Sequence, residues 1–319
     1  MGITPALFRK AMVVAVEAVE LAASAIKSRK VGNLLEVVEI EGGAFAQGSH
    51  FFRDNPARWT GLTDFFMGRT AVTEGQLRRV AKDIAFGNER IAALKKFKLH
   101  PDSIPDSHPA VCTSHDDAVE FVRQLNATEE ARASGLRFGL PTEAQQEFAI
   151  KGRMVDVRGF IQKLGVEPSS EDAVRKFMAD RLENPMLARP HELPELGGKI
   201  LTLDEALPEI LRGQNRVFAA RVFGTPSGRL TAEEAWYGQR GLTTAGWGPV
   251  GPQGLQGRPG GVWEWGADWY YGDIIRSRFI VDPLGPASGE YRVMRGGSWY
   301  NQDPEYLRAA CRRNGRPVG

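Results

Sequence analysis

Apolar side chains recur every three to four residues in several segments of the chain, a spacing typical of amphipathic helices. In "SHDDAVEFVRQLNA", Phe121 and Leu125 lie on one such face. Ser114 and Asp117 stand three positions apart just ahead of the apolar run, a capping-box pattern that predicts where the helix begins. This segment is therefore predicted to be a helix with one side against a core.

Further helices and strands are predicted to alternate between residues 35 and 152. Thr73 and Thr142 are candidate N-caps for the segments "EGQLRRVAKDIAF" and "EAQQEFAIKG". The segment "NLLEVVEIEGGAFAQGS" is typical of two short strands on either side of a Gly-Gly turn. Together with the 36 glycines of the chain, this alternation predicts an α+β fold that is irregular and loop-rich.

Two other regions are predicted to be helical additions. Residues 1–30 form a candidate N-terminal helix, and Glu17 and Glu20 inside it disfavour a secretory signal. Residues 153–245 contain "SSEDAVRKFMADRL" and "TLDEALPEILRG", which predict a helical insertion. No run of ~20 apolar residues indicates a membrane span. We expect a cytoplasmic or phage/virion-associated protein whose first helix docks onto a partner or a second copy.

The composition is that of an ordinary folded domain, with 42% hydrophobic and 25% charged residues in a chain of 319. The formal net charge is +2 and both signs are interspersed, which gives no reason to expect nucleic acid or an anionic membrane as partner. Cys112 and Cys311 lie far apart in the sequence, and two cysteines do not make a disulfide framework.

The motifs that most often carry chemistry are missing from the sequence. None of the five histidines pairs with another at the i, i+4 spacing of a zinc site, and no Cys-x-x-Cys occurs. Ser298 in "GGSW" lacks the Gly-x-Ser-x-Gly context of a nucleophile elbow. Glu264 and Asp268 are a candidate acid–base pair, of a kind that almost any chain of this length offers. We therefore predict no catalytic residues, no metal and no cofactor.

Two aromatic segments near the C-terminus are candidates for binding. In "GVWEWGADWYYGD", Trp263 and Trp265 alternate as the side chains of a strand do, and form either a core seam or a platform on which a sugar or base stacks. The segment "RVMRGGSWYNQDPEYLRAACRRNGRP" combines a Gly-Gly turn with tyrosine, asparagine and arginine. These residue types provide rigid contact area and adaptable hydrogen bonds, so the segment is either a binding surface or a solvated loop.

Six segments carry a resemblance to a known family. They are "IEGGAFAQGS" (40–49), "FFMGRTAVTEGQLRRV" (65–80), "HPAVCTSHDDAVEFVRQL" (108–125), "RFGLPTEAQQEFAIKG" (137–152), "GGVWEWGADWY" (260–270) and "YRVMRGGSWYNQDPEYLRAACRRN" (291–314). In this order they resemble the formylglycine-generating-enzyme (sulfatase-modifying factor) family. The resemblance implies a C-type-lectin-like fold of that type over residues 35–319, with 153–245 as a helical insertion and the helix 1–30 outside it.

The resemblance does not extend to the catalytic residues of the oxidase members, which bind copper through a cysteine pair shortly after "RGGS". Residues 299–306 contain no cysteine here, and Cu(I) prefers thiolate ligands. A protein that is not an enzyme is therefore expected. The alternatives are a metal-dependent oxidase or other enzyme of the family that uses different ligands, and a structural subunit that assembles through its helices.

The C-terminal segment is most similar to the variable proteins of diversity-generating retroelements, whose lectin-like domain is diversified by adenine-templated mutagenesis. In the candidate variable region 295–319, the resemblance assigns a scaffold role to Arg295, Gly296, Gly297, Ser298, Trp299, Pro304, Leu307, Arg308, Ala310 and Arg312, supported by Trp263 and Trp265. It assigns the diversified face to Tyr300, Asn301, Gln302, Asp303, Glu305, Tyr306, Cys311, Arg313, Asn314, Gly315 and Arg316. The implied function is receptor-type binding of a protein or glycan ligand by this face.

Overall fold

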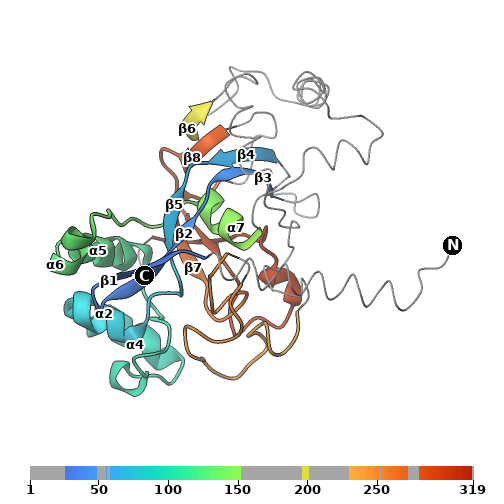
Figure 1. Ribbon diagram of the computed structural model, residues 1–319. Helices are drawn as coiled ribbons and strands as arrows, with labels where there is room; N and C mark the ends of the chain where they lie inside the picture. The colour runs from blue at the N-terminus through green and yellow to red at the C-terminus, as the bar shows by residue number, and fades with distance from the viewer. Residues whose placement is uncertain are drawn as a thin grey trace, which may run out of the picture.

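Helices and strands are mixed along the chain and joined by long irregular stretches, as the sequence predicts (Figure 1). The computed structural model describes residues 26–48, 55, 58–151, 196–200, 230–251, 253–271 and 280–317. Within these residues the strands form three small sheets. The fold is therefore of the mixed α and β, loop-rich type.

Most of the helices lie together on one side of the molecule (Figure 1). They are α2 (Glu74–Val80), α3 (Lys82–Ala85), α4 (Asn88–Lys96), α5 (His115–Asn126) and α6 (Glu129–Ser134), with a 3-10 turn, η1, at Pro101–Ser103. Leu77, Ile84, Phe121 and Leu125 meet in a common apolar cluster, which confirms the predicted face of α5. None of the helices in the described part of the chain has the length and apolar character needed to cross a bilayer.

The three predicted N-caps are confirmed. The side chains of Thr73 and Ser114 each accept a backbone N–H of the first turn, and both positions form a full capping box. Thr142 does the same ahead of α7 (Glu143–Lys151), where it accepts the N–H of Gln145 at 3.2 Å. The helix predicted after Thr73 is interrupted at Ala81, where the backbone leaves the helical region, so α2 and α3 are separate.

The two predicted strands are present, but several strands pair with partners that are far away in the sequence. One antiparallel sheet has the order β1 (Ser28–Val31), β2 (Leu35–Ile40), β5 (Phe65–Gly68). A second contains β3 (Gly43–Gln47), β4 (Arg58–Leu62), β8 (Ile280–Pro286) and β6 (Leu196–Ile200), with β4 and β8 parallel. The third has the order β10 (Arg313–Gly315), β9 (Arg292–Arg295), β7 (Glu264–Trp269). The two strands predicted in residues 33–49 thus exist as β2 and β3 but belong to different sheets.

Helix α7 is the central element of the fold (Figure 1), because it contacts strands of both the second and the third sheet. Its Phe148 is fully buried and meets Phe45 of β3 edge to face, with 5.0 Å between ring centroids. Its opposite side carries Glu143 and Glu147, which are also buried. The helix therefore presents carboxylates toward β9 in the C-terminal sheet.

Two of the predicted boundaries need correction. The N-terminal helix cannot extend to residue 30, because Ser28–Val31 pairs with β2 as a strand; residues 1–25 lie outside the described part. In the predicted insertion, residues 230–245 form turns and no helix, since four glycines between 238 and 248 favour turns. The two predicted helical segments, 169–182 and 202–213, lie outside the described residues.

Candidate binding face

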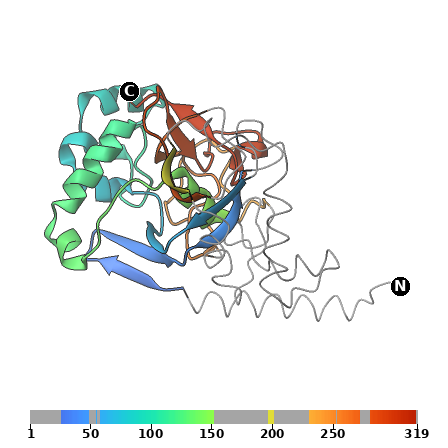
Figure 2. The ribbon, with the colours of Figure 1, turned by 90° about the horizontal axis from the view of Figure 1, so that it is seen from above.

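The candidate variable region begins at the end of β9 with a tight glycine turn. Gly296 and Gly297 both have positive φ, at 104° and 73°. A Cβ at Gly297 would lie 2.9 Å from the carbonyl oxygen of Tyr306, so no other residue fits there without a shift of the backbone. After this turn the chain forms a short 3-10 helix, η3 (Pro304–Leu307), and then β10. Figure 2 shows the red strands of this C-terminal region at one edge of the molecule, with the C-terminus beside the helices.

The inner side of this segment is held by Arg295, whose side chain is 1% exposed. Its Nε and Nη2 donate to Oε1 of Glu143 at 3.1 and 2.6 Å, and Nη2 also lies 2.8 Å from Oε2 of Glu147. Its Nη1 donates to the carbonyl oxygen of Ala309 at 2.6 Å. One guanidinium therefore joins β9, helix α7 and the returning backbone.

Arg312 approaches the same carboxylate from the other end of the segment. Its Nε donates to Oε1 of Glu143 at 2.6 Å and its Nη2 to Oε2 at 2.9 Å. Its Nη1 donates to the carbonyl oxygen of Tyr271 at 2.8 Å, and the guanidinium lies 4.4 Å from the ring centroid of Tyr270. Because Arg295 and Arg312 share Glu143, the chain between them is fixed at both ends by one side chain of α7.

Two further buried acids complete this ion-pair network. Burial alone would raise the pKa of Glu147, but Lys151 at 2.5 Å and Arg295 together lower it. Asp268 accepts the backbone N–H of Glu143 at 2.6 Å. Its burial, and then the negative charge of Glu143, raise the pKa of Asp268 to about 7. Breaking one partner of such a buried network is costly, since it leaves a charge without compensation.

The outer side of the segment carries most of the predicted face. Tyr300 is 68% exposed and Tyr306 is 44% exposed. The other exposed members are Gln302, Asp303, Arg313, Asn314 and Arg316, and the half-buried members are Asn301, Glu305 and Gly315. Nine of the ten predicted scaffold positions in the segment, including Leu307 at 1% exposure, are buried or half-buried; Pro304 alone is exposed. The division between buried and exposed residues is thus close to the predicted division between scaffold and face.

Three members of the predicted face also shape the backbone that carries them. Oδ1 of Asn301 accepts the backbone N–H of Ser298 at 2.8 Å, which closes the turn below Tyr300. Oδ1 of Asp303 accepts the N–H of Glu305 at 2.9 Å and caps η3. The carboxylate of Glu305 pairs with Arg308. Replacing these residues would therefore change the local turn as well as the surface chemistry.

Two positions predicted to lie on the diversified face are packed against the frame instead. Cys311 is only 5% exposed, because it follows the buried Ala310 where the chain returns to the core. At Gly315 an added Cβ would lie 2.8 Å from Cζ3 of Trp265 and 2.9 Å from Cε of Met294. Assigning Cys311 to the face is therefore wrong, and Gly315 is in contact with the scaffold.

The two tryptophans have different roles. The indole N–H of Trp265 donates to the carbonyl oxygen of Thr113 at 3.0 Å, and its ring meets His115 edge to face. Trp263, which directly precedes β7, meets Tyr306 edge to face with 6.3 Å between centroids and lies 5.8 Å below the guanidinium of Arg313. Trp265 is thus a core seam, whereas Trp263 supports the exposed face.

A second segment, which sequence reasoning missed, borders this face. The backbone N–H groups of Gly238 and Gln239 donate to the carbonyl oxygens of Asn301 and Trp299 at 2.7 and 2.8 Å. Residues 236–245 were predicted to be part of a helical insertion. The glycines that flank "QR" at 239–240 were the available signal for a turn at this point.

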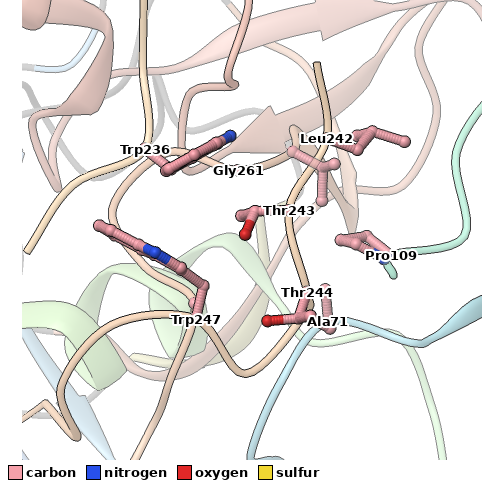
Figure 3. Close-up of a pocket in the computed structure, with 11 residues that line it drawn as sticks. Ala71, Pro109, Trp236, Leu242, Thr243, Thr244, Trp247 and Gly261 are labelled. Atoms are coloured by element: carbon pink, nitrogen blue, oxygen red, sulfur yellow. The ribbon is translucent and has the colours of Figure 1, made fainter. Parts of the chain in front are cut away.

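This second segment lines a small pocket. Trp236 and Trp247 contact each other on one side of it with 5.1 Å between ring centroids, and Thr243 lies beside them (Figure 3). Pro109 and Leu242 close the other side. None of the tyrosines of the face lines this pocket, so the two surfaces are separate.

The candidate acid–base pair does not form a joint site. Glu264 pairs with Arg258, whereas Asp268 is buried beneath the ion-pair network. Cys112 is half-buried and Cys311 is buried. Among the residues that the structure describes, no three histidine, cysteine, aspartate or glutamate side chains are grouped as metal ligands.

Fold and face together define an α+β domain that displays exposed side chains on a frame of buried ion pairs. The family model for the sulfatase-modifying factor enzyme 1-like domain matches residues 22–182 and 225–319. The chain therefore belongs to this family.

Similarity to individual proteins is limited to short segments at the level of sequence. The chain is 42% identical over 71 residues to the serine/threonine-protein kinase pkn1 of Chlamydia caviae, which is 22% of this chain and 11% of that protein. It is 39% identical over 66 residues to the formylglycine-generating enzyme of Streptomyces coelicolor, which is 20% of this chain and 21% of that protein. The matched segments thus span a tenth to a fifth of these curated relatives.

Similarity to solved structures extends over nearly the whole chain. Treponema denticola variable protein 1 superposes with a TM-score of 0.53 and 19% identity, covering 92% of this chain and 94% of that one. PvdO from Pseudomonas aeruginosa gives a TM-score of 0.53 and 17% identity, covering 91% and 92%. At these identities the likeness establishes the shared fold and no more.

Proposed function

We propose that this protein is a receptor-type ligand-binding variable protein of a diversity-generating retroelement and not an enzyme. Its α+β domain would be a C-type-lectin-like fold of the formylglycine-generating-enzyme type. One observation carries the proposal: within residues 295–316 the buried side chains form a fixed frame, and seven residues of the predicted face are exposed. Such a segment can change its surface while it keeps its fold.

The chemistry of the exposed residues supports binding. Tyr300 and Tyr306 are large and rigid. Tyr300 contacts Trp299 edge to face, and Tyr306 contacts Trp263 in the same way. Tyrosine supplies contact area at a low cost in side-chain entropy, and neighbouring polar residues add hydrogen bonds. The two tyrosines are therefore the proposed anchors for a protein or glycan ligand.

The proposed diversification has its own test in the DNA that surrounds the gene. Family membership and the fold shared with Treponema denticola variable protein 1 support it. We expect a reverse transcriptase gene nearby and a second copy of the codons for residues 295–319 that differs mainly at adenines. Differences between the copies should fall on exposed positions such as Tyr300 and Arg313. A second copy that differs at the codons for Arg295 and Arg312 instead would contradict the proposal.

Binding is tested by selection on the purified protein. A display library of random peptides of about 12 residues and a glycan array serve as probes, and the variant Tyr300→Ala/Tyr306→Ala is compared with the original protein. Loss of two anchors should weaken binding of any selected ligand by at least about 30-fold, with the melting temperature lowered by only a few degrees. Phe97→Ala, which removes an aromatic ring that is 53% exposed after α4, is the matched control and should bind normally. Equal affinity of the double variant and the control would reject the assignment.

The main alternative is a metal-dependent oxidase, which the 39% identity with a formylglycine-generating enzyme over 66 residues favours. Such an enzyme would need ligands other than a cysteine pair after "RGGS", because residues 299–306 contain no cysteine. Metal analysis of the purified protein distinguishes the two functions. Stoichiometric copper or iron, with turnover of a cysteine-containing peptide, would establish the oxidase.

We further propose that the N-terminal segment 1–30 docks onto a partner or a second copy, and that the protein acts in the cytoplasm or on a virion. The apolar period of "AMVVAVEAVELAASAI" supports the docking role. Light scattering of the full chain should give a mass above that of the 35.1 kDa monomer, and the charge variant Val13→Glu/Val16→Glu should reduce it. A monomeric mass for the unmodified chain would exclude self-association.

A further inference from the structure

The loop Trp236–Gly241, which lies outside the candidate variable region, is bound to the turn that carries Tyr300. The two hydrogen bonds from Gly238 and Gln239 to Asn301 and Trp299, at 2.7 and 2.8 Å, join the loop to this turn through the backbone alone. They do not depend on which side chains occupy positions 299 and 301. The loop therefore keeps its place beside the face even if the face changes.

The same loop is closed by its own contacts. The indole N–H of Trp236 donates to the carbonyl oxygen of Gly241 at 3.0 Å, which joins the two ends of the loop. The backbone of Trp236 also pairs with residues 259–261, where Gly261 donates to its carbonyl oxygen at 2.9 Å. Gln239 and Arg240 at the tip are exposed. A rigid loop with an exposed tip next to an exposed face suits a role in recognition.

The exposed charges on loop and face are predominantly positive. The exposed cations are Arg240, Arg313 and Arg316, and the exposed acid is Asp303; Arg308 and Glu305 are half-buried. Glu305 is paired with Arg308, and Arg316 approaches Glu290 only at 3.9 Å. Within the described part of the chain, Arg240 and Arg313 make no ion pair with a carboxylate. Two arginines thus remain available to an acidic ligand, one near each end of the tyrosine-bearing segment.

We propose that the loop Trp236–Gly241 is an invariant part of the binding face, and that the composite face takes an acidic segment of a protein partner. This proposal rests on the proposed function. Arg240 and Arg313 would each bind a carboxylate, and Tyr300 and Tyr306 would pack against the chain between them. Arginine suits this role because its planar group binds carboxylates with two hydrogen bonds.

A protein partner fits these observations better than a nucleic acid or a small sugar. Tyrosine, tryptophan and arginine are the residues enriched in protein interfaces. The chain's net charge of +2 is too small for a typical nucleic-acid-binding domain. The tyrosines of the face do not line the one pocket described above, whereas small ligands usually bind in concavities.

The test uses the peptides selected on the unmodified full-length protein. The selected sequences should be enriched in aspartate and glutamate, and the best peptide should bind at least about tenfold more tightly than its version with asparagine and glutamine in place of those acids. Arg240→Glu should weaken the acidic peptide by about tenfold or more, and Arg240→Gln by less. Lys95→Glu, an exposed charge reversal in the last turn of α4, should change binding less than about twofold. Affinity should fall as salt rises.

The outcomes separate this proposal from the one on which it rests. If no peptide or glycan depends on Tyr300 and Tyr306, the proposed function fails. If selected peptides depend on these tyrosines but lack acids, or bind equally to Arg240→Glu and Lys95→Glu, the composite acidic-ligand face alone is wrong. Tighter binding of a single-stranded oligonucleotide than of the acidic peptide, with the same dependence on Arg240, would also overturn it in favour of a nucleic acid.

Discussion

The two sides of the C-terminal segment are held by different kinds of contact. On the inner side Arg295 and Arg312 are buried, and both bind Glu143 of α7 through several hydrogen bonds. On the outer side Tyr300 is 68% exposed and contacts the ring of Trp299. Stability and surface chemistry are therefore assigned to different residues of one short segment.

A second buried ion pair, in the helical part of the molecule, differs from the network around Glu143 in what it joins. Arg90 of α4 and Glu74 of α2 are both buried and lie 2.6 Å apart. Arg90 also donates to the carbonyl oxygens of Ala85 and Val111, so this pair fixes helices and loops to one another. In the C-terminal network the arginines come from the displaying segment itself, which attaches that segment to α7 at both ends.

The largest effect is expected from Glu143→Gln, which leaves Arg295 and Arg312 without their shared carboxylate. Loss of one partner from a buried ion pair costs about 3–5 kcal/mol, and urea unfolding should show a decrease of that size. Glu129→Gln is the matched control, because Glu129 is also in the first turn of its helix, α6, but is exposed. It should change the free energy of unfolding by less than about 0.5 kcal/mol. Similar small changes in both variants would mean that the network does not hold the segment.

A smaller loss is expected from Gly315→Ala, which tests where the frame ends and the face begins. The added methyl group would press on the rings of Trp265 and on Met294, and overpacking of this kind costs about 1–3 kcal/mol. The neighbouring Asn314→Ala should be nearly neutral, because Asn314 is exposed. If both variants unfold at the same urea concentration, position 315 belongs to the face, as the sequence predicted.

Local signals in the sequence were sufficient for the helix starts, whereas most of the frame was predicted from the family resemblance. Thr73, Ser114 and Thr142 cap their helices because a cap depends on residues only three positions away. The resemblance to the family placed Arg295 and Arg312 in the scaffold. It could not indicate Glu143 as their partner, since residues 143 and 295 are separated by 152 positions.

Most features that the sequence did not predict depend on contacts between distant segments. Ser28–Val31 is an exception, because it becomes a strand by pairing with the adjacent β2, although the preceding residues have a helical period. Cys311 is buried by the return of the chain to the core and not by any local pattern. The loop at Gly238 and Gln239 is defined by hydrogen bonds to residues about 60 positions away, which no local spacing marks.

The frame should also give stability a distinctive pH dependence through Asp268. Its burial and the charge of Glu143 raise its pKa to about 7 from an ordinary 3.8, although Arg295 and Arg312 act in the opposite direction. Between these values the folded state binds more protons than the unfolded state, so the free energy of unfolding falls as the pH rises. In Asp268→Asn, which keeps an acceptor for the N–H of Glu143, this fall should be smaller by roughly 1–3 kcal/mol.

The comparison needs urea unfolding at about pH 5 and about pH 8 for each variant. Asp303→Asn, which changes an exposed aspartate of the outer side, should follow the pH dependence of the original protein. If Asp268→Asn also follows the pH dependence of the original protein, the carboxyl group of Asp268 is charged in the folded state throughout this range. Its burial would then not raise its pKa.

The smallest effect on stability is expected when most of the outer side is replaced together. The variant carries alanine at four exposed positions, Tyr300, Gln302, Arg313 and Asn314. Exposed substitutions usually cost within about 0.5 kcal/mol each, so the combined loss should stay near or below about 1 kcal/mol by urea unfolding. Adding Tyr306→Ala removes the edge-to-face contact with Trp263 and should cost about 0.5–1.5 kcal/mol more. A loss above about 3 kcal/mol for the first four changes would mean that the outer side also holds the fold, and the division between frame and face would then be wrong.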